Sequence, residues 1–207
     1  MLTHTSHSEK VFVMRIFLSV LVLIFTLKSW TMADDIRDFE IEGISIGDSL
    51  LEHFDESEIK SSYKKASFYK NNTFAVIFVK NKSKKYDRVQ ITLKPDDNNH
   101  EVFAIEGIID FDKKINECNK KKKSIIEDIN YLFTDSERLD DDSTYEADQT
   151  NNSFSYNTYF FLNTGGFISV SCTEMGKEVR KSRGWTDELA IAVTSEEMEN
   201  FLRGDPF

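Results

Sequence analysis

A change in hydrophobic spacing constrains the fold of this chain more than any other feature of its sequence. Before and after residues 112–133, apolar residues form short runs that are continuous or alternate with polar ones, a pattern typical of β-strands. Within 112–133 the period lengthens to that of one face of an α-helix. The residues that recur at helical spacing are Ile115, Cys118, Ile125, Ile129 and Leu132. We therefore expect a single α+β domain in which one long helix packs on one face of a sheet.

Six or seven strands are expected around this helix, and the sheet should be mainly antiparallel because short turns join neighbouring runs. The clearest hairpin signal is Gly165-Gly166, since both residues tolerate positive φ and lie between two alternating runs. The expected strands are a short one beginning at Phe39 and the runs 74–79, 86–93, 102–109, 154–162, 167–175 and 188–193.

Short helices are expected near both ends of the domain. Asp48 or Ser49 should cap a first helix, and the polar patch that begins at Asp55 should cap a second helix that runs through Tyr63. Ser195 should cap a terminal helix. The N- and C-terminal helices are thus predicted from their capping residues.

Polar segments between these elements have plain structural interpretations. The acidic segment 134–152 lacks the alternating acids, central glycine and terminal glutamate of an EF-hand, so we interpret it as a flexible, solvated loop. Residues 177–184 are expected to form a polar, basic loop. The run Lys120–Lys123 lies on the long helix, where four consecutive side chains fan around the axis, which favours a solvated surface over a patch for an acidic partner.

The N-terminal residues have the pattern of a secretory signal peptide. Arg15 precedes the apolar run Ile16–Leu27, and the small residue Ala33 offers a cleavage site before an acidic turn. The run of twelve residues is shorter than the roughly 20 that span a bilayer. We therefore predict a cleaved signal peptide at 1–33, with Met14 favoured as the true start, and a mature domain at 34–207.

Export has consequences for the partners of the mature chain. The full sequence has 26 basic and 36 acidic residues, and cleavage removes Lys10, Arg15, Lys28 and Glu9, which leaves 23 basic against 35 acidic residues and a net charge of −12. Such a domain has no electrostatic attraction to a phosphate backbone, so nucleic acid is not an expected partner. We expect a periplasmic or secreted protein with no stable membrane span after cleavage.

Two cysteines, Cys118 and Cys172, are the only ones in the chain. In an oxidising compartment a pair normally forms a disulfide. Cys118 lies on the apolar stripe of the expected helix, and Cys172 shares a strand face with Ile168 and Val170, so each points to a helix–sheet interface. Because redox pairs usually lie two residues apart, we predict a structural disulfide and regard two buried free thiols as the lesser alternative.

Residues for catalysis, metal binding or cofactor binding are sparse. His53 and His100 are the histidines of the expected mature chain, and an ordinary surface or helix-face position accounts for each of them, so no nucleophilic site is indicated. No zinc-type set of ligands and no cofactor motif is present. The segment Gly43–Gly47 lacks the glycines and lysine of phosphate-binding loops, which favours a tight turn.

Residues 38–51, DFEIEGISIGDSLL, resemble uncharacterised exported proteins of AT-rich marine alphaproteobacteria, which carry a similar segment just after a signal peptide. The resemblance implies an export route and transfers no activity or site. We expect a non-enzymatic binding or interaction module for a protein or small-molecule ligand of the cell envelope. The alternative is an envelope hydrolase that uses a pair of carboxylates, for which spatial separation and not composition would be the evidence.

Overall fold

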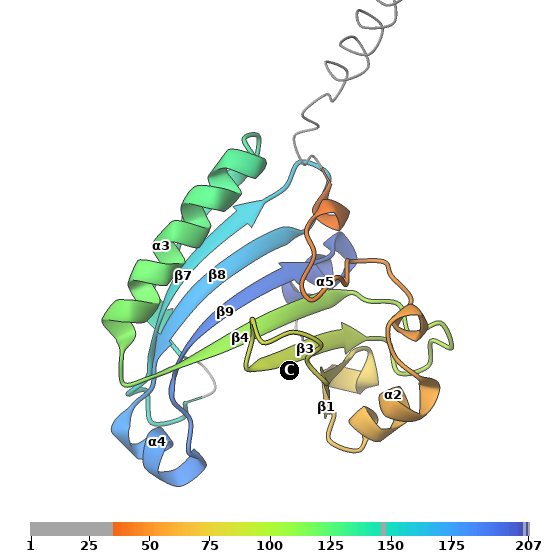
Figure 1. Cartoon of the computed structure of the whole chain (residues 1–207), viewed down its shortest axis with the longest axis horizontal. Helices are drawn as coiled ribbons and strands as arrows, with labels where there is room; N and C mark the ends of the chain where they lie inside the picture. Colours follow the sequence, from red (N-terminus) through yellow and green to blue (C-terminus); the bar gives the residue numbers. More distant parts are fainter. Residues whose placement is uncertain (1–34, 146–147, 205, 207) are drawn as a thin grey trace, which may run out of the picture. The chain divides into compact units, whose positions relative to one another are not determined.

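Nine strands form one antiparallel sheet in the computed structural model, which describes residues 35–145, 148–204 and 206 (Figure 1). The order across the sheet is β1-β2-β3-β4-β9-β8-β7-β5, and β6 pairs with β7. The strands are β1 (Ser67–Phe68), β2 (Ala75–Val79), β3 (Arg88–Leu93), β4 (Ala104–Asp112), β5 (Glu137–Asp140), β6 (Ser143–Thr144), β7 (Phe154–Phe161), β8 (Phe167–Glu174) and β9 (Asp187–Thr194).

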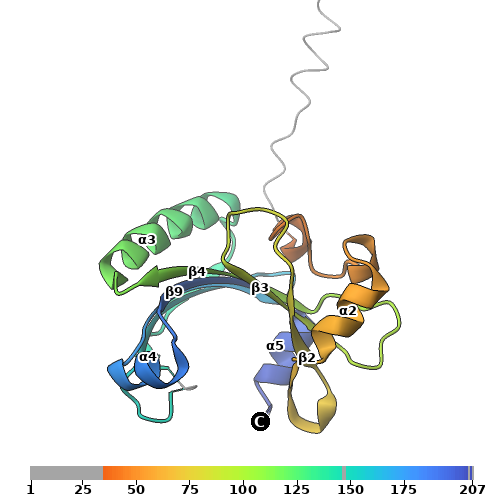
Figure 2. The same ribbon diagram turned by 60° about the horizontal axis from the view of Figure 1, so that its bottom comes forward.

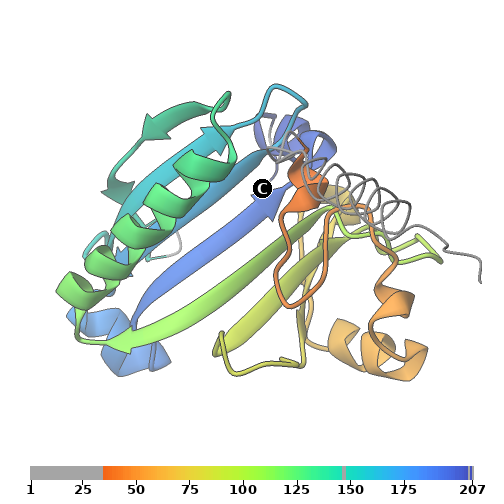
Figure 3. The same cartoon turned by 45° about the horizontal axis from the view of Figure 1, so that its top comes forward.

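The sheet is arched, and its two faces differ (Figure 2). The helix α3 (Ile115–Leu132) covers the outer face and packs on β8, β9 and β4 (Figure 3). Side chains on that face are apolar and buried, among them Ile105, Val170 and Leu189. Three shorter helices, α2 (Glu56–Tyr63), α4 (Lys177–Arg183) and α5 (Glu196–Leu202), lie at the margins. The opposite, concave face has no such helix across its centre in the described part of the chain.

The expected α+β class and antiparallel sheet are confirmed, whereas the strand count of six or seven is too low. Six of the expected runs correspond to β2, β3, β4, β7, β8 and β9. The short strand expected at Phe39 is wrong, because Glu42 and Gly43 adopt positive φ and turn the chain so that Ile41 forms only an isolated bridge with Ile44.

The three additional strands are short and exposed. β5 and β6 lie within the acidic segment 134–152 that was expected to be a loop. All four residues of β5 are exposed, so main-chain pairing with β7 holds the strand and no apolar alternation marks it in the sequence. Because β5 has no buried apolar residues, the hydrophobic period of the sequence does not predict it.

The helices were predicted with mixed success. α3 corresponds to the expected helix 112–133, and α2 and α5 begin at the expected caps, Asp55 with a capping box and Ser195 accepting from the amide of Met198. The helix expected after Asp48 or Ser49 is only a turn of 3₁₀-helix, Leu50–Glu52. The expected loop 177–184 instead contains α4, which has a single buried residue and therefore no apolar period to reveal it.

The predicted signal peptide and the favoured start at Met14 lie outside the described residues. Within the described ranges, no helix is long and apolar enough to cross a membrane.

Candidate functional site

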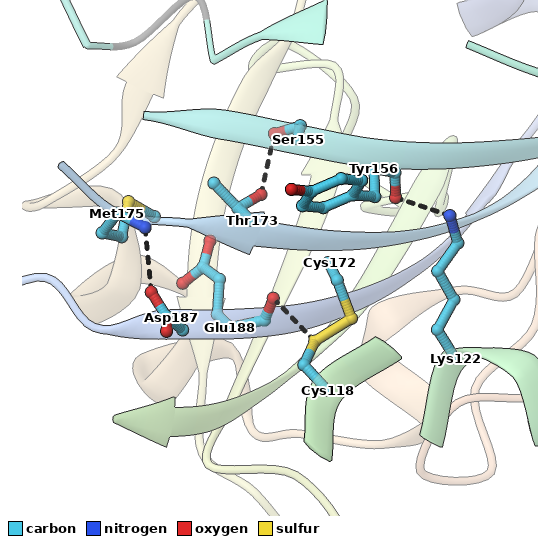
Figure 4. Close-up of a disulfide and its surroundings, with 9 residues drawn as sticks. All are labelled: Cys118, Lys122, Ser155, Tyr156, Cys172, Thr173, Met175, Asp187 and Glu188. Carbon is cyan, nitrogen blue, oxygen red and sulfur yellow. Dashed lines mark hydrogen bonds between the residues drawn. A yellow bond between two sulfur atoms is a disulfide. The ribbon is translucent and has the colours of Figure 1, made fainter. Parts of the chain in front are cut away.

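A cleft of about 790 Å³ lies on the concave face of the sheet, opposite α3. The strands that form the floor of the cleft carry small side chains there, which leaves space above the sheet. Ala190 of β9 pairs with Ser171 of β8, and both line the cleft together with Ser155 and Thr173. The hydroxyl groups of Ser155 and Thr173 lie 2.9 Å apart and hydrogen-bond to each other (Figure 4). The cleft therefore results from small residues on three neighbouring strands, β7, β8 and β9.

Glu106 of β4 lies on one side of this floor and is partly buried. The side-chain amide of Gln90, directly opposite on β3, donates a hydrogen bond to its carboxyl group. Burial, and to a smaller extent the charge of Glu188, raise the pKa of Glu106 from 4.5 to about 7. A carboxyl group with such a pKa holds a proton for much of the time near neutral pH and can then donate a hydrogen bond as well as accept one.

Arg88 and two further carboxylates form an ion-pair network beside Glu106. The Nη2 atom of Arg88 lies 2.6 Å from a carboxylate oxygen of Glu188 and 2.7 Å from one of Asp110. Burial raises the pKa of Glu188, and the hydrogen bond from Arg88 opposes that rise. Of the described residues that line the cleft, Arg88 is the basic one, and its guanidinium is already shared by two carboxylates.

Aromatic side chains stand at the margins of the cleft. Phe78, which is 48% exposed, pairs across β2 and β3 with Gln90 and so lies in the same cross-strand row as Glu106. On another side, the rings of Tyr145 and Trp185 meet edge to face with centroids 6.2 Å apart. Burial, with the nearby charges of Glu188 and Glu106, raises the pKa of Tyr145 to about 12. The cleft thus combines a polar floor with aromatic edges.

A buried ion pair holds the margin that carries Trp185. Asp187, at the start of β9, forms a salt bridge with Arg180 of α4 and accepts a hydrogen bond of 2.9 Å from the amide of Met175 (Figure 4). Arg180 also donates to the carbonyl of Met175 at 2.7 Å. Because Asp187 is only 1% exposed, these bonds tie α4 to the end of the sheet.

The disulfide lies on the other face of the sheet, beneath the cleft (Figure 4). Cys118 of α3 is bonded to Cys172 of β8 with Cα atoms 6.0 Å apart, and both residues are fully buried. The Sγ atom of Cys118 lies 3.4 Å from the carbonyl oxygen of Glu188, whose side chain lines the cleft. The predicted pairing of the two cysteines is therefore present, and it joins the long helix to strands that form the cleft floor.

Lys122 departs from the solvated surface expected for the run Lys120–Lys123. Lys122 is only 8% exposed, and its ammonium group donates a 2.7 Å hydrogen bond to the carbonyl of Tyr156 (Figure 4). The position follows one helical turn after Cys118, so the side chain lies on the face that packs against the sheet. The other three lysines of the run are exposed, as predicted.

His53 and His100 lie outside the cleft lining. His53 Nε2 is 3.0 Å from a carboxylate oxygen of Asp48, which also accepts from the amide of Ser45 in the turn at Gly43–Gly47. The His100 ring lies 6.1 Å from that of Tyr63. Across the described ranges, no group of three or more His, Cys, Asp or Glu side chains could hold a metal ion.

Three acids in otherwise apolar strand sequences mark the cleft face. Glu106 and Asp110 interrupt the apolar run of β4 four positions apart, on the same strand face, and Glu188 precedes the apolar run of β9, opposite Asp110 in the sheet. Neither their proximity nor the pairing of β4 with β9 follows from spacing along the chain.

No protein-family model matches this chain, and comparisons with curated proteins and with solved structures also find no match. The cleft is therefore the basis on which a function can be assigned.

Proposed function

We propose that this protein is an exported, non-enzymatic binding module whose concave cleft takes a small polar ligand. The observation that carries the proposal is the cleft of about 790 Å³, which lies within the usual size range of small-molecule sites. Its lining contributes hydrogen-bonding groups from Glu106, Gln90 and Ser171 and aromatic surface at its edges.

The proposed compartment is periplasmic or extracellular, after removal of residues 1–33. Two features support it: the apolar run Ile16–Leu27 with its flanking residues, and the pairing of the only two cysteines in a buried disulfide. We also propose, from the segment 38–51, a relationship to the exported alphaproteobacterial proteins that it resembles.

A carboxylate-based hydrolase is the second candidate, and one observation favours it. Glu106, with a pKa of about 7, has the properties of a general acid, while Glu188 is a second carboxyl group in the same cleft. Two carboxyl groups in different environments are the usual equipment of glycoside hydrolysis. Glu188 would have to act as the base or nucleophile. However, its carboxylate already forms a salt bridge of 2.6 Å with Arg88.

Ligand-observed NMR on wild-type protein and two matched variants would test the binding function. The probes are a mixture of monosaccharides, disaccharides, amino acids and polyamines. Ser171→Phe places a ring in the cleft, whereas Ser57→Phe places the same ring on the exposed surface of α2. We expect binding to the wild type and to Ser57→Phe, and none to Ser171→Phe.

An absence of binding by every probe class to the wild type would contradict the proposed function. Turnover of peptidoglycan, glycan or ester substrates that Glu106→Gln abolishes would instead establish the hydrolase. Thermal denaturation of both phenylalanine variants shows whether each is folded, so that loss of binding can be separated from loss of structure.

A further inference from the structure

The charges around the cleft restrict the ligands that it can bind. An anionic ligand needs a basic group, but Arg88, the basic residue among the described lining residues, already bonds Asp110 at 2.7 Å and Glu188 at 2.6 Å. A carboxylate or phosphate would have to displace one of these partners and would lie near Glu106 and Glu188. Both effects disfavour an anion.

The carboxylates that could attract a cation lie away from Glu106 in the lining: Glu188, which shares Arg88 with Asp110, and Asp141. Beside Gln90 the carboxyl group is that of Glu106, whose pKa is raised to about 7, so this group is protonated for much of the time near neutral pH. The lining of the floor therefore favours an uncharged ligand that both donates and accepts hydrogen bonds. Hydroxyl groups have this property.

Glu106 and Gln90 have hydrogen-bonding capacity left for such groups. The amide nitrogen of Gln90 donates to one carboxyl oxygen of Glu106. The remaining oxygen of each side chain accepts no hydrogen bond from any residue in the described ranges. The two side chains are cross-strand neighbours on the same face, so their oxygens are presented together.

Phe78 adds an apolar surface next to this polar pair. It is the cross-strand neighbour of Gln90, it lines the cleft, and nearly half of its surface is exposed. A sugar ring has the complementary shape, because its C–H bonds form an apolar face while its hydroxyl groups project from the edge. An aromatic ring beside an amide and a carboxyl group can contact both parts at once.

We propose that the cleft binds a neutral saccharide, whose ring lies against Phe78 and whose hydroxyl groups hydrogen-bond to Gln90 and Glu106. This inference rests on the proposed binding function and specifies its ligand class. The lining is open enough for one or two sugar rings, and the polar groups of Asn157 and Ser171 lie farther along the same floor.

Trp185 provides a reporter inside the site. The chain has two tryptophans. Trp30 belongs to residues 1–33, which the proposed processing removes, and Trp30→Phe leaves Trp185, at the margin of the cleft, as the only one in the unprocessed full chain. We would titrate this full-length variant with glucose, galactose, N-acetylglucosamine and cellobiose, and record the intensity and wavelength of its fluorescence. Glucosamine and glucuronic acid serve as probes of similar shape that carry a positive and a negative charge.

Three variants in the Trp30→Phe background locate the binding surface. Phe78→Ala and Gln90→Leu should each weaken saccharide binding about ten-fold or more, since each loses a contact or hydrogen bond with the ligand. Phe68→Ala is the matched control: Phe68 is 51% exposed on the neighbouring strand β1 and is not among the residues that line the cleft. It should leave the affinity unchanged within about two-fold.

The outcomes separate this inference from the function on which it rests. Binding of neutral saccharides that Phe78→Ala weakens and Phe68→Ala does not would support the inference. Equal effects of the two alanine variants, or tighter binding of glucosamine or glucuronic acid than of glucose, would overturn it. Binding of amino acids or polyamines without saccharides would overturn the ligand class and leave the binding function standing, whereas no binding by any class would overturn both.

Discussion

Replacing Cys118 and Cys172 together with alanine measures what the disulfide contributes to stability. The two residues are 54 positions apart, and closing a loop of this length in the unfolded chain corresponds to about 4 kcal/mol in the chain-entropy model. The free energy of unfolding of the double variant should therefore be lower by about that amount. For a domain of this size, such a loss lowers the melting temperature by roughly 8–16 °C.

Urea denaturation followed by far-ultraviolet circular dichroism gives the free energy of unfolding by linear extrapolation. The matched control is wild-type protein kept reduced, which lacks the cross-link but retains both buried sulfur atoms. If the restricted unfolded state is the cause, the reduced protein should lose nearly as much stability as the double variant. This control is needed because the alanine substitutions also remove the two fully buried sulfur atoms, and that loss of packing lowers stability by itself.

Two results would refute this reasoning. A loss below about 1 kcal/mol in both proteins would show that the cross-link does not restrict the unfolded chain as the model assumes. A large loss in the double variant with little loss in the reduced wild type would assign the effect to packing between α3 and β8 and not to the covalent link.

Three further substitutions test other parts of the structure. Because folding raises the pKa of Glu106 from 4.5 to about 7, its protonated form stabilises the folded state below pH 4.5, and this stabilisation is lost as the pH rises through about 7. The free energy of unfolding of the wild type should therefore fall by roughly 3 kcal/mol between these pH values. Urea titrations of Glu106→Gln should not show this fall. Asp187→Ala leaves the partly buried Arg180 without its carboxylate and should lower the free energy of unfolding by about 3 kcal/mol, with a smaller loss for Asp187→Asn. Gly107→Ala should cost about 1–3 kcal/mol because the added Cβ overlaps the ring of Tyr86, and thermal denaturation should show partial recovery when Tyr86→Leu is added. No pH dependence for Glu106, no loss for Asp187→Ala, or no recovery for the Gly107 pair would contradict the respective assignment.

Much of the architecture followed from local pattern. The helix α3 was predictable because Cys118 and Ile129 recur on one face, and the central strands were predictable because each carries apolar residues on at least one face. The short exposed strands were not predictable, because main-chain hydrogen bonds to a neighbouring strand hold them and their side chains show no apolar alternation. The helix α4 was not predictable because it buries a single residue, Val179, and its position depends on the ion pair between Arg180 and Asp187.

The candidate site was the least predictable part. Glu106 and Glu188 lie 82 positions apart, and each alone is an ordinary acid on a strand. They share a cleft because β9 returns to pair with β4 after the helices α3 and α4 and the four strands β5 to β8. The abundance of acids in the sequence made a carboxylate pair impossible to select by composition.

From its sequence alone, this protein was determined to be an α+β domain with a long amphipathic helix, an acidic surface and two cysteines placed to face each other. The helix and the strands depend on residues close together in the chain, where periodicity and capping act. The acidity follows from composition, and the direction of each cysteine follows from the phase of its own helix or strand. The tertiary structure decided that β4 and β9 are neighbours, that small residues hollow the concave face, and that burial there raises the pKa of Glu106. Those properties depend on which strands pair and on how far each side chain is removed from solvent. Neither can be read from residues that are close together in the sequence.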